Sequence, residues 1–169
     1  ADSSLVDIGA GAGFPGIPLK IVRPDINITM IDGLNKRVVF LNDVIKKLNL
    51  TNIVAIHGRC EDFAKKPEFR EKFDYCVARA VAKLNTLAEY CLPFVKVGGS
   101  FVSMKSADSN EEVNEAKKAI SILGGKIEED ILFDLVDDMP RRIVKLKKNS
   151  QTPTKYPRPS AQIFKKPLK

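Results

Sequence analysis

The stretch DIGAGAGFPGIP, residues 7–18, constrains the fold more than any other part of this sequence. It places four glycines within ten residues, directly after the β-forming run SSLV, and it carries Pro15 and Pro18 where a helix would begin. Glycine lets the backbone turn tightly and bring its N–H groups against a ligand, and proline suits the first turn of a helix. The stretch therefore predicts a strand, a ligand-binding glycine turn and a short helix.

Apolar runs typical of strands alternate along the chain with amphipathic helical patterns. Strands are expected at Ser4–Ile8, Ile26–Asp32, Ile53–His57, Phe73–Ala78 and Ser100–Lys105, and helices at about Ile17–Val22, Lys36–Leu48, Val81–Phe94 and Glu111–Leu123. The clearest helix carries its apolar face on Val38, Leu41, Val44, Ile45 and Leu48. This alternation predicts an α/β, Rossmann-like fold whose parallel sheet is covered on both faces and binds ligands at the carboxyl ends of its strands.

The pattern changes after Leu123–Gly125. KIEEDILFDLV and RRIVKLKK are two successive strand patterns, which predict a C-terminal antiparallel hairpin against the sheet. The last segment, NSQTPTKYPRPSAQIFKKPLK, is rich in proline and basic residues and is expected to be an ordered or semi-ordered loop tail. Because the chain has 169 residues and no long low-complexity linker, we expect a single domain over residues 1–169.

The positive charge is concentrated at one end of the sequence. Residues 140–169 contain ten Lys or Arg and no Asp or Glu, so the formal net charge of +7 comes from this segment alone. A cluster of cations of this kind indicates a polyanionic partner such as RNA.

The three cysteines, Cys60, Cys76 and Cys91, lack C-x-x-C spacing, so neither a disulfide framework nor a zinc site is indicated. No apolar run approaches the ~20 residues that cross a bilayer, and no charged-then-apolar leader precedes the first strand. We expect a cytoplasmic protein that binds no metal and no membrane.

Two cofactors fit the glycine turn. GAGFPG, residues 11–16, matches the G-x-G-x-x-G pattern of dinucleotide-binding proteins, and DIGAGAG, residues 7–13, matches the D-x-G-x-G-x-G pattern of S-adenosylmethionine-dependent methyltransferases. In both classes Asp32, at the end of the second strand, would hold ribose hydroxyls. Hydride transfer needs a proton donor, but His57 is the sole histidine and no Tyr-x-x-x-Lys pair exists. A methyltransferase is favoured; an NAD-dependent oxidoreductase and a non-catalytic RNA-binding module remain alternatives.

The methyl acceptor is suggested by missing signatures. The segment after the fourth strand, FDYCVARAV, lacks the N/D-P-P-Y-like turn of enzymes that methylate exocyclic amines. Cys91 lies inside a predicted helix, where a core role suits it better than nucleophilic attack on a pyrimidine. N7 of guanine has a free in-plane lone pair and attacks without a general base, so we assign no catalytic residue.

Several motifs together resemble one family. The segments DIGAGAGFPGIPL, IDGLNKRVVFL, GRCEDF, ARAVAKL, LPFVKVGG and YPRPSAQIFKKPL cover the chain nearly end to end. In this combination they resemble the bacterial guanine-N7 methyltransferases of small-subunit (16S) ribosomal RNA, the glucose-inhibited division protein B family. The resemblance implies a Rossmann-like methyltransferase fold, S-adenosylmethionine as cofactor, and 16S ribosomal RNA or a small-subunit assembly intermediate as partner.

The sequence departs from the family in small ways. Gly33, Cys60 and Ser106 stand where the family often has Ser, Ala and Gly, which are exchanges of one small residue for another. Family members also carry a helical segment ahead of the first strand, whereas this sequence begins a few residues before Asp7, so we expect that it lacks that segment.

The resemblance also implies cofactor-binding residues. Gly9 and Phe14 would line the methionine and ribose end, beside Gly11 of the same glycine pattern, and Asp32 would accept the ribose hydroxyls. Cys60 and Glu61 would hold the adenine side. Arg79 would reach either the methionine carboxylate or the substrate.

RNA contacts are expected from basic residues near the end of the fifth strand and in the C-terminal segment, because Arg and Lys supply most phosphate contacts. The candidates are Lys105, Arg141, Arg142, Lys155 and Arg158, with Tyr156 as an aromatic ring that would stack on an unpaired base.

Overall fold

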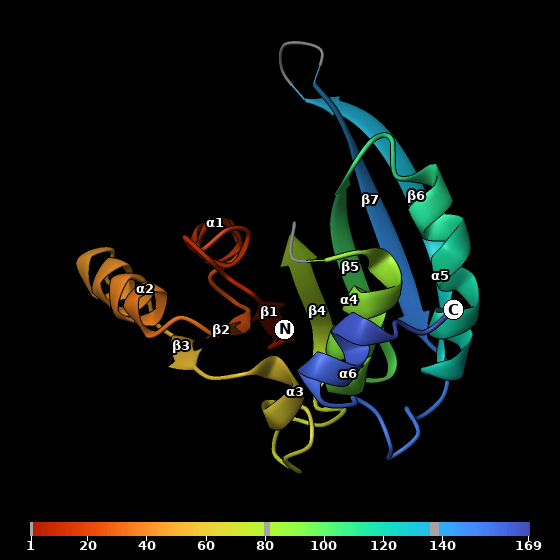
Figure 1. Cartoon of the computed structure of the whole chain (residues 1–169). Helices are drawn as coiled ribbons and strands as arrows, with labels where there is room; N and C mark the ends of the chain where they lie inside the picture. Colours follow the sequence, from red (N-terminus) through yellow and green to blue (C-terminus); the bar gives the residue numbers. More distant parts are fainter. Residues whose placement is uncertain (1, 80–81, 136–138) are drawn as a thin grey trace.

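The structure is a computed structural model that describes residues 2–79, 82–135 and 139–169. Within these residues seven strands form one sheet, in the order β3-β2-β1-β4-β5-β7-β6 (Figure 1). The strands are β1 Ser4–Ile8, β2 Asn27–Asp32, β3 Ile53–His57, β4 Phe73–Arg79, β5 Val95–Ser106, β6 Gly125–Leu135 and β7 Met139–Lys148. The helices are α1 Gly16–Val22, α2 Asn35–Lys47, α3 Cys60–Phe63, α4 Leu84–Cys91, η1 Leu92–Phe94 (a 3-10 turn), α5 Asn110–Ile122 and α6 Ser160–Lys165.

The first five strands are parallel and the last two are not. Val6 of β1 lies between Thr29 of β2 and Cys76 of β4 in parallel register. β7 pairs with β5 in antiparallel register, with Phe101 opposite Leu146, and β6 pairs antiparallel with the outer side of β7. The predicted α/β class, the mostly parallel sheet and the C-terminal hairpin are therefore confirmed.

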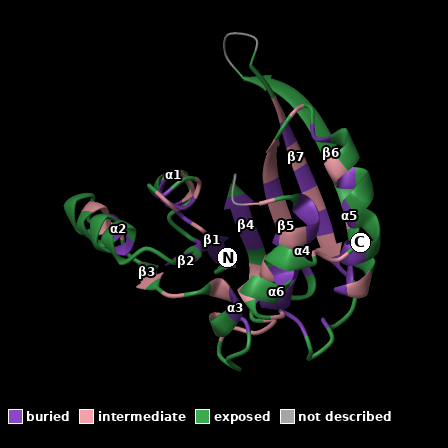
Figure 2. Ribbon diagram, viewed as in Figure 1, coloured by how far each residue is buried: buried purple, intermediate pink, exposed green. Residues whose placement is uncertain are grey.

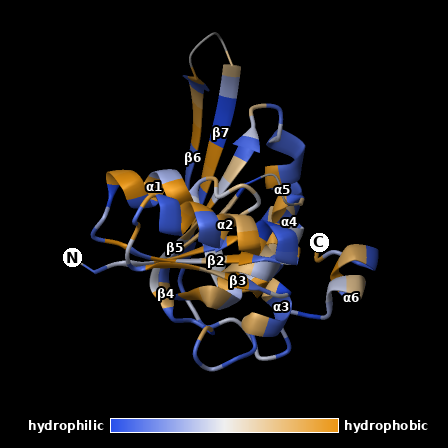
Figure 3. Cartoon of the chain, turned by 90° about the vertical axis from the view of Figure 1, so that its left-hand side faces the viewer, coloured by the Kyte–Doolittle hydropathy of each residue, from blue (hydrophilic) through white to orange (hydrophobic). Residues whose placement is uncertain are grey.

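Each face of the sheet has its own apolar core, because successive side chains of a strand point to opposite faces. On one face Leu5, Met30 and Val77 pack in a cluster with residues of α1 and α2. On the other face Val6 and Cys76 pack in a cluster with α4 and α5. Figure 2 shows the buried residues gathered along the central strands, and Figure 3 shows that these strands are largely hydrophobic. Both faces are covered by helices, as predicted.

Helix α2 follows its apolar spacing only along part of its length. Val38 and Leu41 are buried against the sheet, and Val44 and Ile45 are half-buried. Leu48 is half exposed and lies just beyond the last helical residue, so its expected place in the apolar face was wrong.

The helix expected at residues 81–94 is described as α4 and η1, and its predicted first residue, Val81, lies outside the described residues. The first hairpin strand was expected to end at Val136, which also lies outside them. Among the described residues no helix is long and apolar enough to cross a membrane.

The C-terminal segment contains a helix in addition to the expected ordered loop. Residues 149–159 run back along the body of the molecule, and Ser160–Lys165 form helix α6, which lies next to α4 (Figure 1). Ile163 of α6 is fully buried and Tyr156 belongs to the core under α4 and α5. The expectation of a loop was wrong for α6, because the proline-rich composition concealed two apolar anchors.

Candidate active site

The loop between β1 and α1 depends on glycine. Gly13 has a φ of 93°, in the left-handed region that other residues rarely adopt. A Cβ at Gly16 would lie 2.9 Å from Asp7 Oδ2 and 3.0 Å from Met30 Sδ. The glycine pattern therefore lets the loop turn sharply and lets α1 begin in direct contact with the sheet.

A cavity of about 660 Å³ opens at the carboxyl ends of β1, β2 and β4. Its wall includes Gly9, Gly11 and Phe14 of the glycine loop, Asp32 at the end of β2 and Arg79 at the end of β4. The Arg79 guanidinium lies 5.5 Å from the centroid of the Phe14 ring, within cation–π range. The cavity thus combines exposed backbone and one carboxylate with three arginines, Arg37, Arg59 and Arg79. Such a wall offers an acceptor for ribose hydroxyls and cations for a carboxylate.

The Asp32 carboxylate ties two loops together. Its Oδ2 accepts a hydrogen bond from the Gly11 N–H at 2.9 Å, and its Oδ1 accepts one from the Leu34 N–H at 2.9 Å. Arg37 Nη1 lies 3.5 Å from Oδ2. Although Asp32 is only 3% exposed, a carboxylate can accept about four hydrogen bonds, so it has capacity left for a ligand hydroxyl.

Asp7, in β1, holds the glycine loop through a hydrogen bond at the start of α1. Its Oδ2 accepts a hydrogen bond from the Gly16 N–H at 2.9 Å, and Oδ1 is buried without a hydrogen-bond partner among the described residues. Burial raises the pKa of Asp7 to about 7, against the opposing effects of the Gly16 hydrogen bond and the Arg79 charge. Asp7 is not part of the cavity wall and acts through the position of the loop.

We expect Asp7 to make the folded state less stable as pH rises from about 4 to about 7. The carboxyl has a pKa of about 7 when folded and 3.8 ordinarily, so in this window the folded state binds more protons than the unfolded state. The stability that protonated Asp7 contributes is therefore full below about pH 4 and is lost as pH rises through 7. In Asp7→Asn this loss, on the order of 4 kcal/mol, should disappear. Urea unfolding at several pH values gives the free energy of unfolding of both proteins. If this free energy changes with pH in the same way in both, the prediction is contradicted.

Two further cavities adjoin the first. One, of about 190 Å³, shares Gly9, Gly33 and Arg59 with it and is also lined by Cys60 and Glu61. The other, of about 770 Å³, shares Arg79 and lies under the β6–β7 hairpin. Its wall joins apolar side chains to basic ones, namely Met104, Phe133, Leu135 and Ile143 with Lys83, Lys105, Arg141 and Arg142. One ligand could thus occupy the 660 Å³ and 190 Å³ cavities beside the glycine loop, while a second ligand reaches it through the 770 Å³ cavity.

Sequence comparisons decide the family. The family described as rRNA small subunit methyltransferase G matches residues 1–144. The chain belongs to this family. It is 56% identical over 168 residues to the ribosomal RNA small subunit methyltransferase G of Desulforamulus reducens, covering 98% of this chain and 70% of that protein. It is 54% identical to the protein of the same name from Acetivibrio thermocellus, covering 98% of this chain and 68% of that protein.

Solved structures share the fold at low sequence identity. A putative transferase of Pyrococcus horikoshii has a TM-score of 0.67 at 16% identity, covering 86% of this chain and 56% of that one. A putative methyltransferase of Thermoplasma acidophilum has a TM-score of 0.68 at 12% identity, covering 89% and 70%. These similarities support the class I methyltransferase fold, and S-adenosylmethionine is the methyl donor that the family implies.

The structure brings the cofactor candidates of this family member together in two adjoining cavities. The 660 Å³ cavity is lined by Gly9, Gly11, Phe14, Asp32 and Arg79, and the 190 Å³ cavity by Gly9, Cys60 and Glu61. Cys60 Sγ lies 3.5 Å from Glu61 Oε2, and burial raises the pKa of the Cys60 thiol well above its ordinary range. The thiol therefore stays neutral and donates to the carboxylate.

The RNA candidates fall into two separate groups. Lys105, Arg141 and Arg142 line the 770 Å³ cavity. Of these, Lys105 pairs with Glu112 at 2.5 Å, and Arg142 donates twice to Asp130 at 2.6 Å. The side chains of Lys105 and Arg142 are 8% and 7% exposed, so they serve mainly as structural ion pairs. Arg141 makes no ion pair with the described residues.

The candidates of the C-terminal segment do not line this cavity. Lys155 is exposed, but Arg158 donates to the buried Glu89 at 2.8 and 2.6 Å. Tyr156 is only 6% exposed, and its ring lies in the core with Lys155 Nζ 5.3 Å from its centroid. The expectation that Tyr156 stacks on an unpaired base does not suit this burial, because a stacking ring must present a face to the RNA.

Some residues of the site were missed in the sequence. Arg59 lines both the 660 and the 190 Å³ cavities, and Tyr90 and Ser160 line the smaller one. Arg59 lies two residues after β3, and its place beyond the carboxyl end of a strand was a usable signal. Tyr90 lies within a helix and Ser160 lies far along the chain, so no local pattern marked them.

Proposed function

We propose that this protein transfers the methyl group of S-adenosylmethionine to N7 of a guanosine in small-subunit ribosomal RNA. The main support is that two cavities share Arg79: one is built on the glycine loop and Asp32, and the other is lined by apolar side chains together with the more accessible cations Lys83 and Arg141. A nucleobase has apolar faces, and its phosphates need cations, so the second cavity suits an RNA nucleotide. Since ribosomal RNA is the substrate, the reaction belongs in the cytoplasm.

The residues of the glycine-loop cavity suit the cofactor. Asp32 would accept the ribose hydroxyls, Arg79 would attract the methionine carboxylate, and Cys60 and Glu61 would meet the adenine. The bound cofactor supplies a methyl group on a sulfonium, which is already a good leaving group. The chain then mainly has to align the acceptor atom with that methyl group.

The choice of methyl acceptor depends on whether the 770 Å³ cavity contains a side chain that can act as a general base. Glu112 is the only carboxylate among the described residues that line the 770 Å³ cavity; it forms an ion pair with Lys105 and accepts a hydrogen bond from the Leu84 N–H. A carboxylate so engaged is a poor general base. Guanine N7 attacks with its own lone pair and loses no proton, so it needs no base; an exocyclic amine would need one. The site therefore favours N7.

The product tests this proposal. Methylation at N7 leaves a fixed positive charge on the purine, and the RNA becomes cleavable at that nucleotide after borohydride and aniline treatment. We expect small-subunit RNA incubated with the protein and S-adenosylmethionine to be cut at one guanosine. A methylated RNA that resists this treatment would exclude N7, and RNA that gains no methyl group would exclude the activity.

A further inference from the structure

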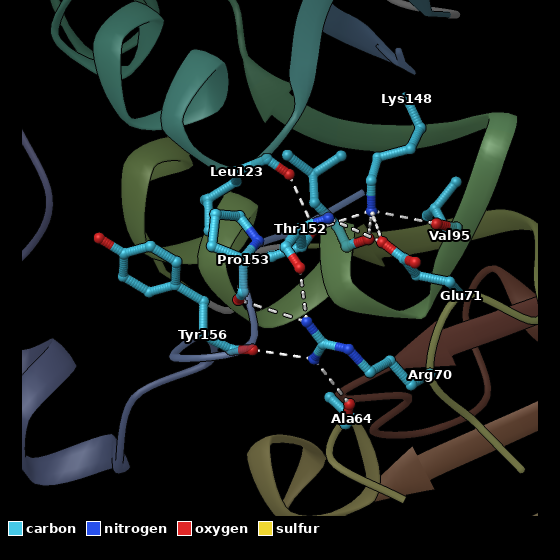
Figure 4. A network of polar contacts seen from close by, with 10 residues as sticks. Ala64, Arg70, Glu71, Val95, Leu123, Lys148, Thr152, Pro153 and Tyr156 are labelled. Carbon is cyan, nitrogen blue, oxygen red and sulfur yellow. Dashed lines mark hydrogen bonds and ion pairs between the residues drawn. The ribbon is translucent and has the colours of Figure 1, made fainter. Parts of the chain in front are cut away.

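The C-terminal arm, residues 152–168, is fixed to the body at its base by a buried polar network (Figure 4). Lys148 Nζ is fully buried and lies 3.0 Å from Glu71 Oε1 and 2.8 Å from Thr152 Oγ1. The Thr152 N–H donates to Glu71 at 2.7 Å. Arg70 donates to the carbonyls of Thr152 at 2.7 Å and Tyr156 at 2.9 Å. These bonds attach the arm to the segment between α3 and β4.

A second set of contacts holds the arm against α4. Glu89 is fully buried and accepts hydrogen bonds from the N–H and the guanidinium of Arg158. Asn85 donates to the Leu168 carbonyl at 2.9 Å, and Ile163 is buried with no exposed surface. The arm therefore has a defined path over α4.

This path brings the arm to the wall of the smaller cavity. Ser160 Oγ lies 3.0 Å from the Tyr90 hydroxyl, and both residues line the 190 Å³ cavity. The same cavity is lined by Cys60 and Glu61 and by the apolar Ile8 and Ile31, with Arg59 and three glycines making up the rest of the lining. Ser160, close to the end of the sequence, thus lines the same cavity as residues at the ends of β1 and β2 and just after β3.

The chemistry of this cavity suits a flat heterocycle. Burial raises the pKa of Tyr90, and the nearby Glu61 and Cys60 raise it as well, so the phenol keeps its proton and remains a donor at neutral pH. Ser160 adds a second hydroxyl, and Glu61, only 6% exposed, adds a buried acceptor. The apolar side chains suit the faces of an adenine ring, and the hydroxyls and carboxylate suit its polar edge.

We propose that Tyr90 and Ser160 form the wall that contacts the adenine of the cofactor, so that the C-terminal arm is part of the cofactor site. This inference rests on the proposed function, because it assumes that S-adenosylmethionine occupies the adjoining glycine-loop cavity. It assigns the arm a role beyond RNA contact. Gly9 and Gly33 line both the 660 Å³ and the 190 Å³ cavities. A cofactor that occupies both would contact Ser160 and so hold α6 in place.

Calorimetry with S-adenosylhomocysteine tests the wall directly. Ser160→Ala should weaken binding about three- to tenfold, the equivalent of one neutral hydrogen bond. Ser160→Phe, which fills the cavity, should weaken it at least thirtyfold. Gln162→Ala is the matched control, because Gln162 is exposed on the same helix, and its affinity should stay within twofold of the starting protein. A folded Ser160→Phe that binds as tightly as the unchanged protein overturns the inference.

Hydrogen exchange on the unchanged protein tests the same wall without relying on a variant that folds. Adding S-adenosylhomocysteine should slow the exchange of the backbone amides in Ser160–Lys165 at least threefold, because the ligand holds the arm closed. Unchanged exchange there, beside clear protection of the glycine loop, overturns the wall and leaves the proposed function standing. If the unchanged protein binds no S-adenosylhomocysteine at all, the proposed function itself fails.

Discussion

Replacing Asp32 with alanine is expected to weaken S-adenosylhomocysteine binding at least tenfold. The carboxylate accepts the Gly11 and Leu34 N–H groups at 2.9 Å each, so it holds both loops that line the 660 Å³ cavity. It is also our candidate acceptor for the ribose hydroxyls. A hydrogen bond to a charged group is worth about 1.5–3 kcal/mol, and a tenfold loss needs only 1.4 kcal/mol. Calorimetry measures the affinity directly.

Two controls make this result specific. Asp43→Asn changes an exposed carboxylate on α2 whose partner is Lys47, and its affinity should be unchanged. Circular dichroism should show that Asp32→Ala keeps its helices and strands. An affinity unchanged in folded Asp32→Ala would mean that the ribose hydroxyls bind elsewhere in the cavity.

The parts of the fold that depend on local sequence were predictable. β1 and β3 have the predicted bounds, and β2 differs by one residue, because an alternating apolar run and a following turn are both visible in a short window. The glycine loop was predictable for the same reason: Gly13 and Gly16 meet steric demands within ten residues of Asp7. The position of Asp32 at the end of a predicted strand marked it as a candidate, and the family motifs added Arg79; both are the last residues of their strands and line the 660 Å³ cavity.

The parts that depend on contacts between distant segments were not predictable. Arg142 and Arg158 looked like free cations, because composition counts charges and does not reveal their partners. In the fold Arg142 pairs with Asp130 across the hairpin, and Arg158 pairs with Glu89 from 69 residues away. Tyr156 and Ile163 stand in a proline-rich, basic stretch, where their burial against α4 leaves no periodic signal.

The same distant pairing leads to a large expected effect on stability. Glu89→Ala should lower the free energy of unfolding by about 3–5 kcal/mol, because breaking a buried ion pair leaves its partner uncompensated. Glu89 is fully buried, and its carboxylate satisfies three donors of Arg158, whose side chain is 15% exposed. For a chain of 169 residues the melting temperature should fall by about 6–20 °C. Differential scanning calorimetry checks the shift.

Glu115→Ala is the matched control, since Glu115 is exposed on α5 and makes no ion pair with the described residues, so its substitution should change stability by no more than ~0.5 kcal/mol. A double variant, Glu89→Leu with Arg158→Met, should recover much of the lost stability, because it leaves no buried charge without a partner. A melting temperature of Glu89→Ala within about 2 °C of the unchanged protein would correspond to less than about 1 kcal/mol. The Glu89–Arg158 ion pair would then not hold the C-terminal arm. If Glu89→Ala melts early, its affinity for S-adenosylhomocysteine should fall at least as far as in Ser160→Ala, since Arg158 and Ser160 lie two residues apart on the same arm.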